Sequence, residues 1–176
     1  MSRLQPESSA ICSWDGELSY KELNELSSTL AHHLVDHGAG PESLVGICFN
    51  KSLWTDLSVV AMLATLKAGA GFVPLNPDHP EERLRDIVDQ MQSHIILVAP
   101  QYQTLCQNLV ETVIPVSQRS ISQLLAYHEK PKTMVTPNNT AYVLFTSGST
   151  GKPKVMHFSL SLKHDVKCAK GRVRVL

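Results

Sequence analysis

Residues 45–75 of the chain are VGICFNKSLWTDLSVVAMLATLKAGAGFVPL, and this stretch decides the fold class. Residues 45–49 and 72–75 are short apolar runs typical of strands, whereas residues 53–68 have the length and composition of a helix. Two strands joined by such a helix pair in parallel, because a parallel crossover needs about a dozen residues or more. The stretch therefore predicts a strand–helix–strand unit of an α/β fold.

The same alternation continues along the chain after this unit. Pro80 is predicted at the first position of a further helix, where the missing N–H costs nothing. Two proline residues and several polar ones between residues 130 and 139 predict an exposed connection. The remaining predicted strands are residues 95–99, 112–116 and 140–145, and the remaining predicted helices are residues 102–109 and 121–127. The fold class is therefore α/β, a mostly parallel sheet with flanking helices.

The N-terminal part predicts a hairpin followed by a helix. Residues 10–14 and 17–20 are strand-like runs on either side of Asp15-Gly16, a pair typical of two-residue type I′ turns. Ser19 and Glu22 have the spacing of a capping box, and Gly38 stands where a glycine often ends a helix. The helix between them has one apolar face, made of Leu23, Leu26, Leu30, Ala31, Leu34 and Val35.

The composition is that of an ordinary globular chain. Hydrophobic residues make up 43% of the 176 residues and charged residues 18%, which argues against disordered and collagen-like proteins. Sixteen basic residues balance sixteen acidic ones, so the chain lacks the positive charge of a nucleic-acid-binding protein. No signal peptide and no stretch long enough to span a bilayer is visible, and a cytoplasmic protein without membrane attachment is expected.

Cysteine and histidine residues show no spacing typical of disulfide frameworks or metal sites. The four cysteines lie far apart and are predicted to be reduced thiols: Cys12, Cys48, Cys106 and Cys168. His32 and His33 are adjacent in a predicted helix, point in different directions and are expected to face solvent. No metal site and no catalytic residue is predicted.

The chemistry of the chain is concentrated in the nine residues 146–154, which follow the last predicted strand. They include four hydroxyl side chains, two glycines and two lysines. Glycines let backbone N–H groups turn toward an anion, hydroxyls donate further hydrogen bonds, and lysines add positive charge. A nucleoside triphosphate is the predicted ligand. The predicted phosphate-binding residues are Thr146, Ser147, Gly148, Ser149, Thr150, Gly151, Lys152 and Lys154.

Two other interpretations of this loop are less favoured. A P-loop would need glycine and a hydroxyl residue where the chain has Thr146 and Pro153. A flexible Gly/Ser linker seldom follows an apolar strand so directly, or ends in Lys-Pro-Lys.

Residues 145–154, FTSGSTGKPK, resemble the phosphate-binding core motif of the adenylate-forming (AMP-binding) superfamily. That superfamily includes acyl-CoA ligases and the adenylation domains of nonribosomal peptide synthetases. Residues 66–77, LKAGAGFVPLNP, and residues 18–23, LSYKEL, are similar to two earlier core motifs of the peptide-synthetase domains. The three segments follow the family's order, and the resemblance covers residues 4–154. Both earlier segments are predicted to have structural rather than catalytic roles.

The resemblance implies ATP-dependent ligase chemistry. In the family, the carboxylate of an amino acid attacks the α-phosphate of ATP, and the acyl group then passes to the phosphopantetheine thiol of a carrier domain. The loop at residues 146–154 would bind the triphosphate, and Mg²⁺ would help to neutralise it. Residues 1–154 are therefore expected to form a partial adenylation domain, the N-terminal subdomain of an adenylate-forming enzyme. The family's adenine-site, ribose-binding, amino-acid-pocket and C-terminal lysine motifs are not found in the chain.

Residues 155–176 depart from the family pattern. The family usually has glycine after Pro-Lys, where this chain has Val155, and the segment carries five basic residues with Asp165 as its only acid. A disordered basic tail is predicted. The sequence as a whole predicts a fragment of an amino-acid-adenylating domain that is inactive on its own. Two alternatives stay open: a non-catalytic truncated product or ATP- or partner-binding module, and a fragment of an acyl-CoA ligase.

Overall fold

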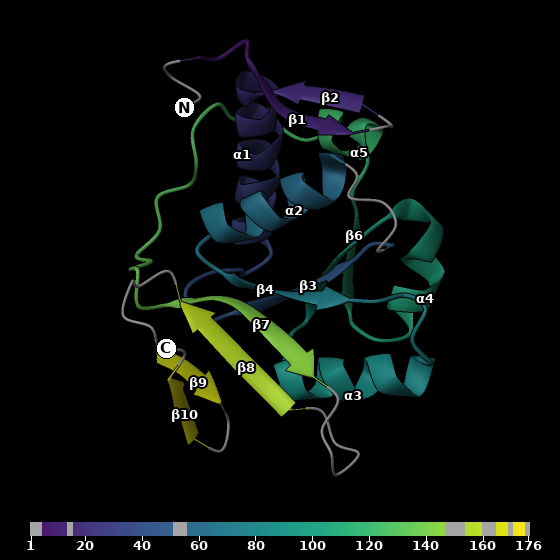
Figure 1. Cartoon of the computed structure of the whole chain (residues 1–176). Helices are drawn as coiled ribbons and strands as arrows, with labels where there is room; N and C mark the ends of the chain where they lie inside the picture. Colours follow the sequence, from purple (N-terminus) through teal and green to yellow (C-terminus); the bar gives the residue numbers. More distant parts are fainter. Residues whose placement is uncertain are drawn as a thin grey trace.

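The computed structural model describes residues 5–13, 16–50, 56–146, 154–159, 165–168 and 171–174. Within these residues, eight strands form one sheet in the order β10-β9-β8-β7-β4-β3-β5-β6 (Figure 1). A separate hairpin of β1 (Ser9–Ser13) and β2 (Gly16–Ser19) packs on the first helix. The strands of the large sheet are β3 (Leu44–Cys48), β4 (Gly71–Leu75), β5 (Ile95–Val98), β6 (Thr112–Pro115), β7 (Thr140–Thr146), β8 (Lys154–Ser159), β9 (Asp165–Cys168) and β10 (Gly171–Arg174).

The five strands from β7 to β6 in this order run parallel to one another. Helix α2 (Asp56–Lys67) connects β3 with β4, and helix α3 (Glu81–Met91) connects β4 with β5. Such helices are the crossovers that parallel pairing requires. The predicted α/β fold, with a mostly parallel sheet and flanking helices, is confirmed.

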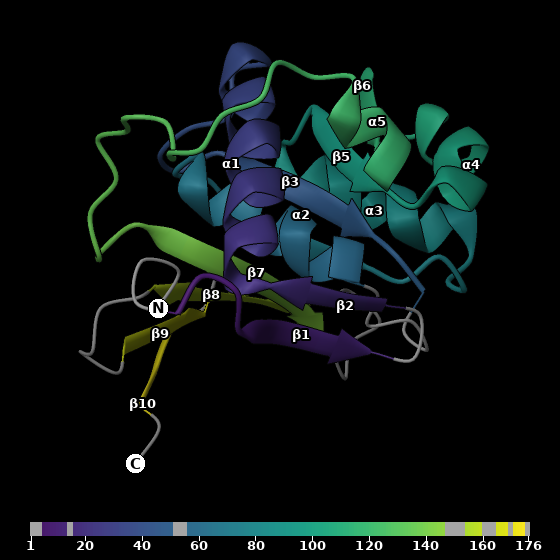
Figure 2. The same ribbon diagram turned by 90° about the horizontal axis from the view of Figure 1, so that it is seen from above.

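Side chains at alternate strand positions enter two apolar cores on opposite faces of the sheet, as the two-residue period of a strand dictates. On one face, α1 (Tyr20–Asp36) and α2 pack on residues such as Val45 and Ile47. On the other face, α3 packs on Val73 and Ile96. Figure 1 shows α1 and α2 on one side of the sheet and α3 on the other, and Figure 2 looks onto the α1 side.

Helix α1 has the two ends that its sequence predicts. The Ser19 hydroxyl accepts a hydrogen bond from the Glu22 backbone N–H at 3.2 Å, and the Glu22 carboxylate accepts one from the Ser19 backbone N–H at 2.8 Å. At the other end Gly38 has a φ of 88°, and the Ala39 N–H donates to the Leu34 carbonyl at 3.0 Å. These are the bonds of a capping box and of a Schellman motif, so local chemistry sets both ends of this helix.

The short helix after β6 differs from its prediction. Helix α5 spans Gln118–Ser122, earlier than the predicted residues 121–127. Ser117 and Ser120 form a second capping box, which starts the helix three residues sooner. Tyr127 is not helical and stacks its ring on His32 of α1, with ring centroids 3.7 Å apart. This packing on α1 removes Tyr127 from the helix.

Smaller differences concern the ends of other elements. In place of the helix predicted over residues 102–109, a short 3-10 helix, η1 (Pro100–Tyr102), leads into α4 (Gln103–Gln107). Pro80 lies just before α3 and not inside it. β1 and β2 pair antiparallel, as the predicted hairpin requires, but Gly16 of the predicted Asp15-Gly16 turn belongs to β2 and pairs with Ser13. Asp15 of the predicted turn and the predicted start of a helix at residue 53 lie outside the described residues.

The described part of residues 154–174 forms strands, where the sequence predicts a disordered tail from residue 155 onward. β8 pairs antiparallel with β7, and β9 and β10 extend the sheet beyond β8. β8 satisfies the backbone groups that β7 would otherwise expose at the edge of the sheet. The division of the chain at residue 154 into a partial adenylation domain and a tail stays a prediction, and β8 crosses it.

Replacing Ser19 by alanine tests the cap of α1. The substitution removes the hydroxyl acceptor of the Glu22 N–H, and we expect it to lower the free energy of unfolding by about 1 kcal/mol. Urea unfolding followed by circular dichroism measures the change. The control is Ser122→Ala, which removes an exposed hydroxyl bonded to the carbonyl of Arg119 in α5. Equal unfolding midpoints for the two variants would contradict the assigned cap.

Candidate functional site

The predicted phosphate loop leaves the sheet at the carboxyl end of β7 and returns as β8. Thr146 ends β7 and Lys154 begins β8, and these two residues are partners in the antiparallel register. Figure 1 shows the arrowhead of β7 beside the start of β8. The structure therefore brings the two ends of the loop together. The other predicted phosphate-binding residues lie outside the described residues: Ser147, Gly148, Ser149, Thr150, Gly151 and Lys152.

The two ends of the loop lie at the carboxyl end of the parallel strands, where α/β proteins bind ligands. β7 is parallel to β4 and β4 is parallel to β3, so the carboxyl ends of all three strands point to one edge. The chain goes from β3 to β4 on one side of β3, and then to β5 on its other side. Ligands of open α/β sheets bind outside the carboxyl ends of the strands at such a reversal of strand order. The carboxyl ends of β3, β4 and β7 are therefore the candidate functional site.

The start of β7 is held by the carboxylate of Glu42. One carboxylate oxygen accepts hydrogen bonds from the Asn139 side-chain amide at 2.7 Å and from the Thr140 backbone N–H at 3.1 Å. The other accepts from the Thr140 hydroxyl at 3.3 Å. Asn139 in turn accepts from the Thr136 backbone N–H at 2.7 Å, which closes a turn just before the strand. β7 is therefore fixed where it enters the sheet.

Close contact between β4 and β7 depends on a glycine. A Cβ on Gly71 would lie 3.0 Å from the Thr140 carbonyl oxygen and 3.0 Å from Cδ2 of Leu44. The Gly71 N–H also donates to the Ser43 carbonyl at 2.9 Å, which ties β4 to the turn that carries Glu42. No residue with a side chain fits here without moving the backbone of β7. Gly71 therefore sets how closely β7, the strand from which the loop departs, approaches β4.

Side chains on both faces of β7 continue this contact. On one face Phe72, Tyr142 and Phe158 stack across β4, β7 and β8, with ring centroids 5.6 Å and 4.4 Å apart. On the other face Val143 is buried and Phe145 packs with the α3-side core. Apolar packing on both faces stabilises the strand from which the loop departs.

Lys67 ends α2 and binds α1 with its ammonium group. Its Nζ lies 2.9 Å from Oδ1 of Asn24, 3.0 Å from the Asn24 carbonyl oxygen, 2.7 Å from the Ser27 hydroxyl and 3.0 Å from the Ser28 hydroxyl. All four acceptors are neutral. Burial, and to a smaller extent the nearby positive charge of Lys130, lower the pKa of Lys67 to about 8. Lys67 therefore connects the two helices through hydrogen bonds, without a carboxylate partner in the described part of the chain.

Glu42 and Lys67 are two positioning residues that sequence reasoning missed. Glu42 belongs to none of the recognised motifs, and it bonds to residues 97 and 98 positions away along the chain. The surrounding Gly-Pro-Glu-Ser predicts only a turn. Lys67 lies in the recognised segment 66–77, where a single lysine among apolar residues at a helix end was the available signal.

Comparison with known proteins shows the family. The family described as "AMP-binding enzyme" matches residues 2–166. The chain belongs to this family. Nonribosomal peptide synthetase TES of Alternaria alternata is 51% identical over 150 residues, which are 85% of this chain and 3% of that protein. Peramine synthetase A of Epichloe festucae is 48% identical over 151 residues, which are 85% of this chain and 5% of that protein.

These relatives confirm the predicted resemblance to part of a peptide-synthetase adenylation domain. The chain spans only a small share of their length. Two solved structures of the AMP-binding fold agree with the fold of this chain. The nonribosomal peptide synthetase FmoA3, in an α-methyl-L-serine-AMP bound form, has a TM-score of 0.74 at 22% identity, over 90% of this chain and 17% of that one. VinN in complex with 3-methylaspartate has a TM-score of 0.75 at 19% identity, over 90% of this chain and 45% of that one.

Cys12 is exposed, Cys48 and Cys106 are buried, and all three are free. No three His, Cys, Asp or Glu residues of the described part come close enough together to hold a metal ion. The helices seen there are all too short or too polar to cross a membrane.

Replacing Gly71 by alanine tests the contact that positions β7. The added methyl group would meet the Thr140 carbonyl oxygen and Leu44, so we expect a loss of roughly 1–3 kcal/mol in the free energy of unfolding. Chemical denaturation measures it. Gly40→Ala is the matched control, because a Cβ there meets nothing within 4 Å. If the two variants are equally stable, the strands do not depend on this close approach.

The pH dependence of stability tests the buried ammonium of Lys67. Its folded pKa of about 8 lies below the ordinary value of 10.5, so folding disfavours its protonated form. As pH rises from about 8 to 10.5, the folded chain releases this proton before the unfolded chain does, and stability increases. We therefore expect the native chain to gain stability relative to Lys67→Met over this range, measured by urea unfolding. A difference that stays constant with pH would contradict the lowered pKa.

Proposed function

We propose that the chain provides the triphosphate-binding part of a domain that activates an amino acid by adenylation. The observation that carries the proposal is the position of the loop. Its two ends pair at the carboxyl end of β7, beside β4 and β3, at the edge where α/β proteins bind ligands. The peptide-synthetase relatives support an amino acid over the acyl substrate of a CoA ligase.

The loop residues would hold the phosphates in three ways. Gly148 and Gly151 allow backbone N–H groups to face the anion, as in other phosphate-binding concavities. The hydroxyls of Thr146, Ser147, Ser149 and Thr150 would donate further hydrogen bonds. Lys152 and Lys154 would supply positive charge as point cations. These residue types fit a triphosphate.

Mg²⁺ would enter together with the nucleotide. It would neutralise phosphate oxygens when bound. Phosphate oxygens would be among its ligands. The loop residues would then orient the triphosphate against the sheet edge.

The reaction would follow the chemistry of the family. The amino acid carboxylate attacks the α-phosphate of ATP, the bond to the β-phosphate breaks, and an aminoacyl-adenylate and pyrophosphate form. A carrier-domain phosphopantetheine thiol would then accept the aminoacyl group. This chain's share of that sequence is to bind and orient the phosphates.

The chain of 176 residues is proposed to bind ATP weakly and to be inactive when studied alone. Each phosphate hydrogen bond contributes roughly 0.5 to 1.5 kcal/mol net, and their sum must offset several kcal/mol lost on association. Base, ribose and amino acid contacts would come from segments with the family's later motifs. An ATP- or partner-binding module without catalysis is the second candidate, and it shares this loop.

Calorimetric titration tests the proposed triphosphate site. We expect ATP, GTP and inorganic triphosphate to bind with similar affinity. The dissociation constants should be about millimolar or weaker, which corresponds to a binding free energy of at most roughly 4 kcal/mol. The double variant Lys152→Ala, Lys154→Ala should abolish the signal, because it removes both cations of the loop.

Arg83→Ala together with Arg85→Ala is the matched control, since both side chains belong to α3. It should leave binding unchanged. Micromolar ATP binding with a clear preference over GTP would favour the binding-module candidate. Binding that survives the double lysine variant would contradict the assigned loop.

A further inference from the structure

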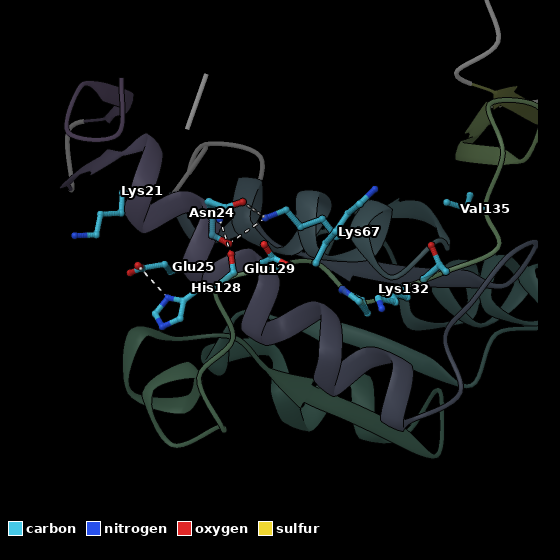
Figure 3. Close-up of a pocket in the computed structure, with 11 residues that line it drawn as sticks. Lys21, Asn24, Glu25, Lys67, His128, Glu129, Lys132 and Val135 are labelled. Carbon is cyan, nitrogen blue, oxygen red and sulfur yellow. Dashed lines mark hydrogen bonds and ion pairs between the residues drawn. The ribbon is translucent and has the colours of Figure 1, made fainter. Parts of the chain in front are cut away.

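A groove of about 680 Å³ lies at the opposite end of the parallel strands from the phosphate loop (Figure 3). Lys67, at the end of α2, comes four residues before the start of β4, whereas the loop follows the carboxyl end of β7. The groove lies between α1, the end of α2 and the connection at residues 128–135. We call it the lysine groove, after the lysines that line it: Lys21, Lys67, Lys130 and Lys132.

The connection that forms one wall is fixed to α1. The Asn24 side-chain amide donates to the His128 carbonyl at 2.9 Å, and the Tyr127 N–H donates to the Thr29 hydroxyl at 3.0 Å. Pro131 is buried farther along the same connection. Most of residues 130–139 are exposed, as the sequence predicts, and the backbone just before them is bonded to α1. The groove is therefore a built feature of the fold.

The other end of this wall packs on Gly69. Gly69 has a φ of 86°, and a Cβ there would lie 3.3 Å from Cβ of Thr133 and 3.4 Å from Cβ of Val135. The left-handed turn at Gly69 therefore lets the connection approach the end of α2 closely. Lys67 and the lysines of the connection are brought to one groove by this contact.

The lysine groove carries more positive charge than the nearby carboxylates neutralise. Lys67 donates only to neutral oxygens, and Lys130 is close enough for their like charges to repel. Lys130 and Lys132 are exposed, and neither takes part in an ion pair among the described residues. Four lysines line the groove against two glutamates, Glu25 and Glu129. Glu25 lies 3.2 Å from His128, and Lys21 lies 3.7 Å from Glu7 outside the groove. An anionic partner would relieve this repulsion.

Exposed apolar side chains adjoin the charged groove. Met134 is 90% exposed, and Val135, which lines the groove, is 38% exposed. Both lie within three residues of Lys132 in the connection. Methionine is common at binding surfaces because its side chain adapts to different partners. This end of the groove is therefore suited to an apolar side chain, next to a part suited to carboxylates.

We propose that the lysine groove docks an acidic polypeptide segment that carries carboxylates and an adjoining apolar side chain. An open groove with charged and apolar parts has the mixed surface of a protein interface. A small anion is less well matched. The amine of Lys67 is already surrounded by four oxygen acceptors, and the amines of Lys130 and Lys132 extend from an exposed wall. Such lysines hold a small anion weakly, but together they attract an extended acidic segment.

The test uses the full chain and a fluorescent synthetic peptide of alternating glutamate and leucine. Fluorescence anisotropy measures its binding. We expect affinity to fall about tenfold in Lys130→Glu and in Lys132→Glu, because each reversal replaces an attraction by a repulsion. Arg119→Glu, an equal charge change at an exposed residue of α5, is the matched control and should bind normally. Met134→Ser should weaken binding, and added salt should weaken it further.

Three results would overturn the proposal. One is no binding of the peptide. Another is an equal loss in Arg119→Glu, which would show a response to net charge alone. The third is displacement of the peptide by inorganic pyrophosphate that binds as tightly as the peptide does, which would indicate a small-anion site. The Lys152→Ala, Lys154→Ala variant should still bind the peptide, so failure here is distinguishable from failure of the phosphate loop.

Discussion

The backbone contact between β4 and β7 at Gly71 is the constraint on which the candidate site depends. Because Gly71 has no side chain, the Thr140 carbonyl can approach β4, and Phe72 and Tyr142 become partners in the parallel register. Glu42 then holds the same end of β7 through three hydrogen bonds. With its start fixed in this way, β7 ends at the carboxyl edge of the sheet. The loop must leave the sheet there, beside β4 and β3.

The parts of the fold that sequence predicts well are those that local chemistry decides. α1 begins just after Ser19 because Ser19 and Glu22 satisfy each other's N–H groups, and it ends before Gly38, which adopts a positive φ. Both signals lie within the helix's own ends. The parallel strands are likewise predictable, because short apolar runs separated by helices leave few other topologies.

The parts that sequence reasoning missed depend on residues far apart in the chain. β8 pairs with β7 across the loop, and the composition of residues 154–159 does not by itself specify that pairing. Glu42 bonds across 97 residues, and Lys67 bonds to α1 across 43. No spacing rule predicts such contacts. The short helix α5 is a different case, since its start is set locally by Ser117 and Ser120, and a serine at the fourth position is not the usual signature of a capping box.

The segment at residues 66–77 performs separate structural tasks along its length. At its amino end Lys67 and Gly69 shape the lysine groove. In its middle Gly71 sets the distance between β4 and β7, and at the end of β4 Leu75 is buried in the α3-side core. A shift of this one strand would therefore move both ends of the sheet. Its residues set the distance between the phosphate-loop end of the sheet and the lysine groove. Substitutions in either site are therefore limited to those that leave β4 in place.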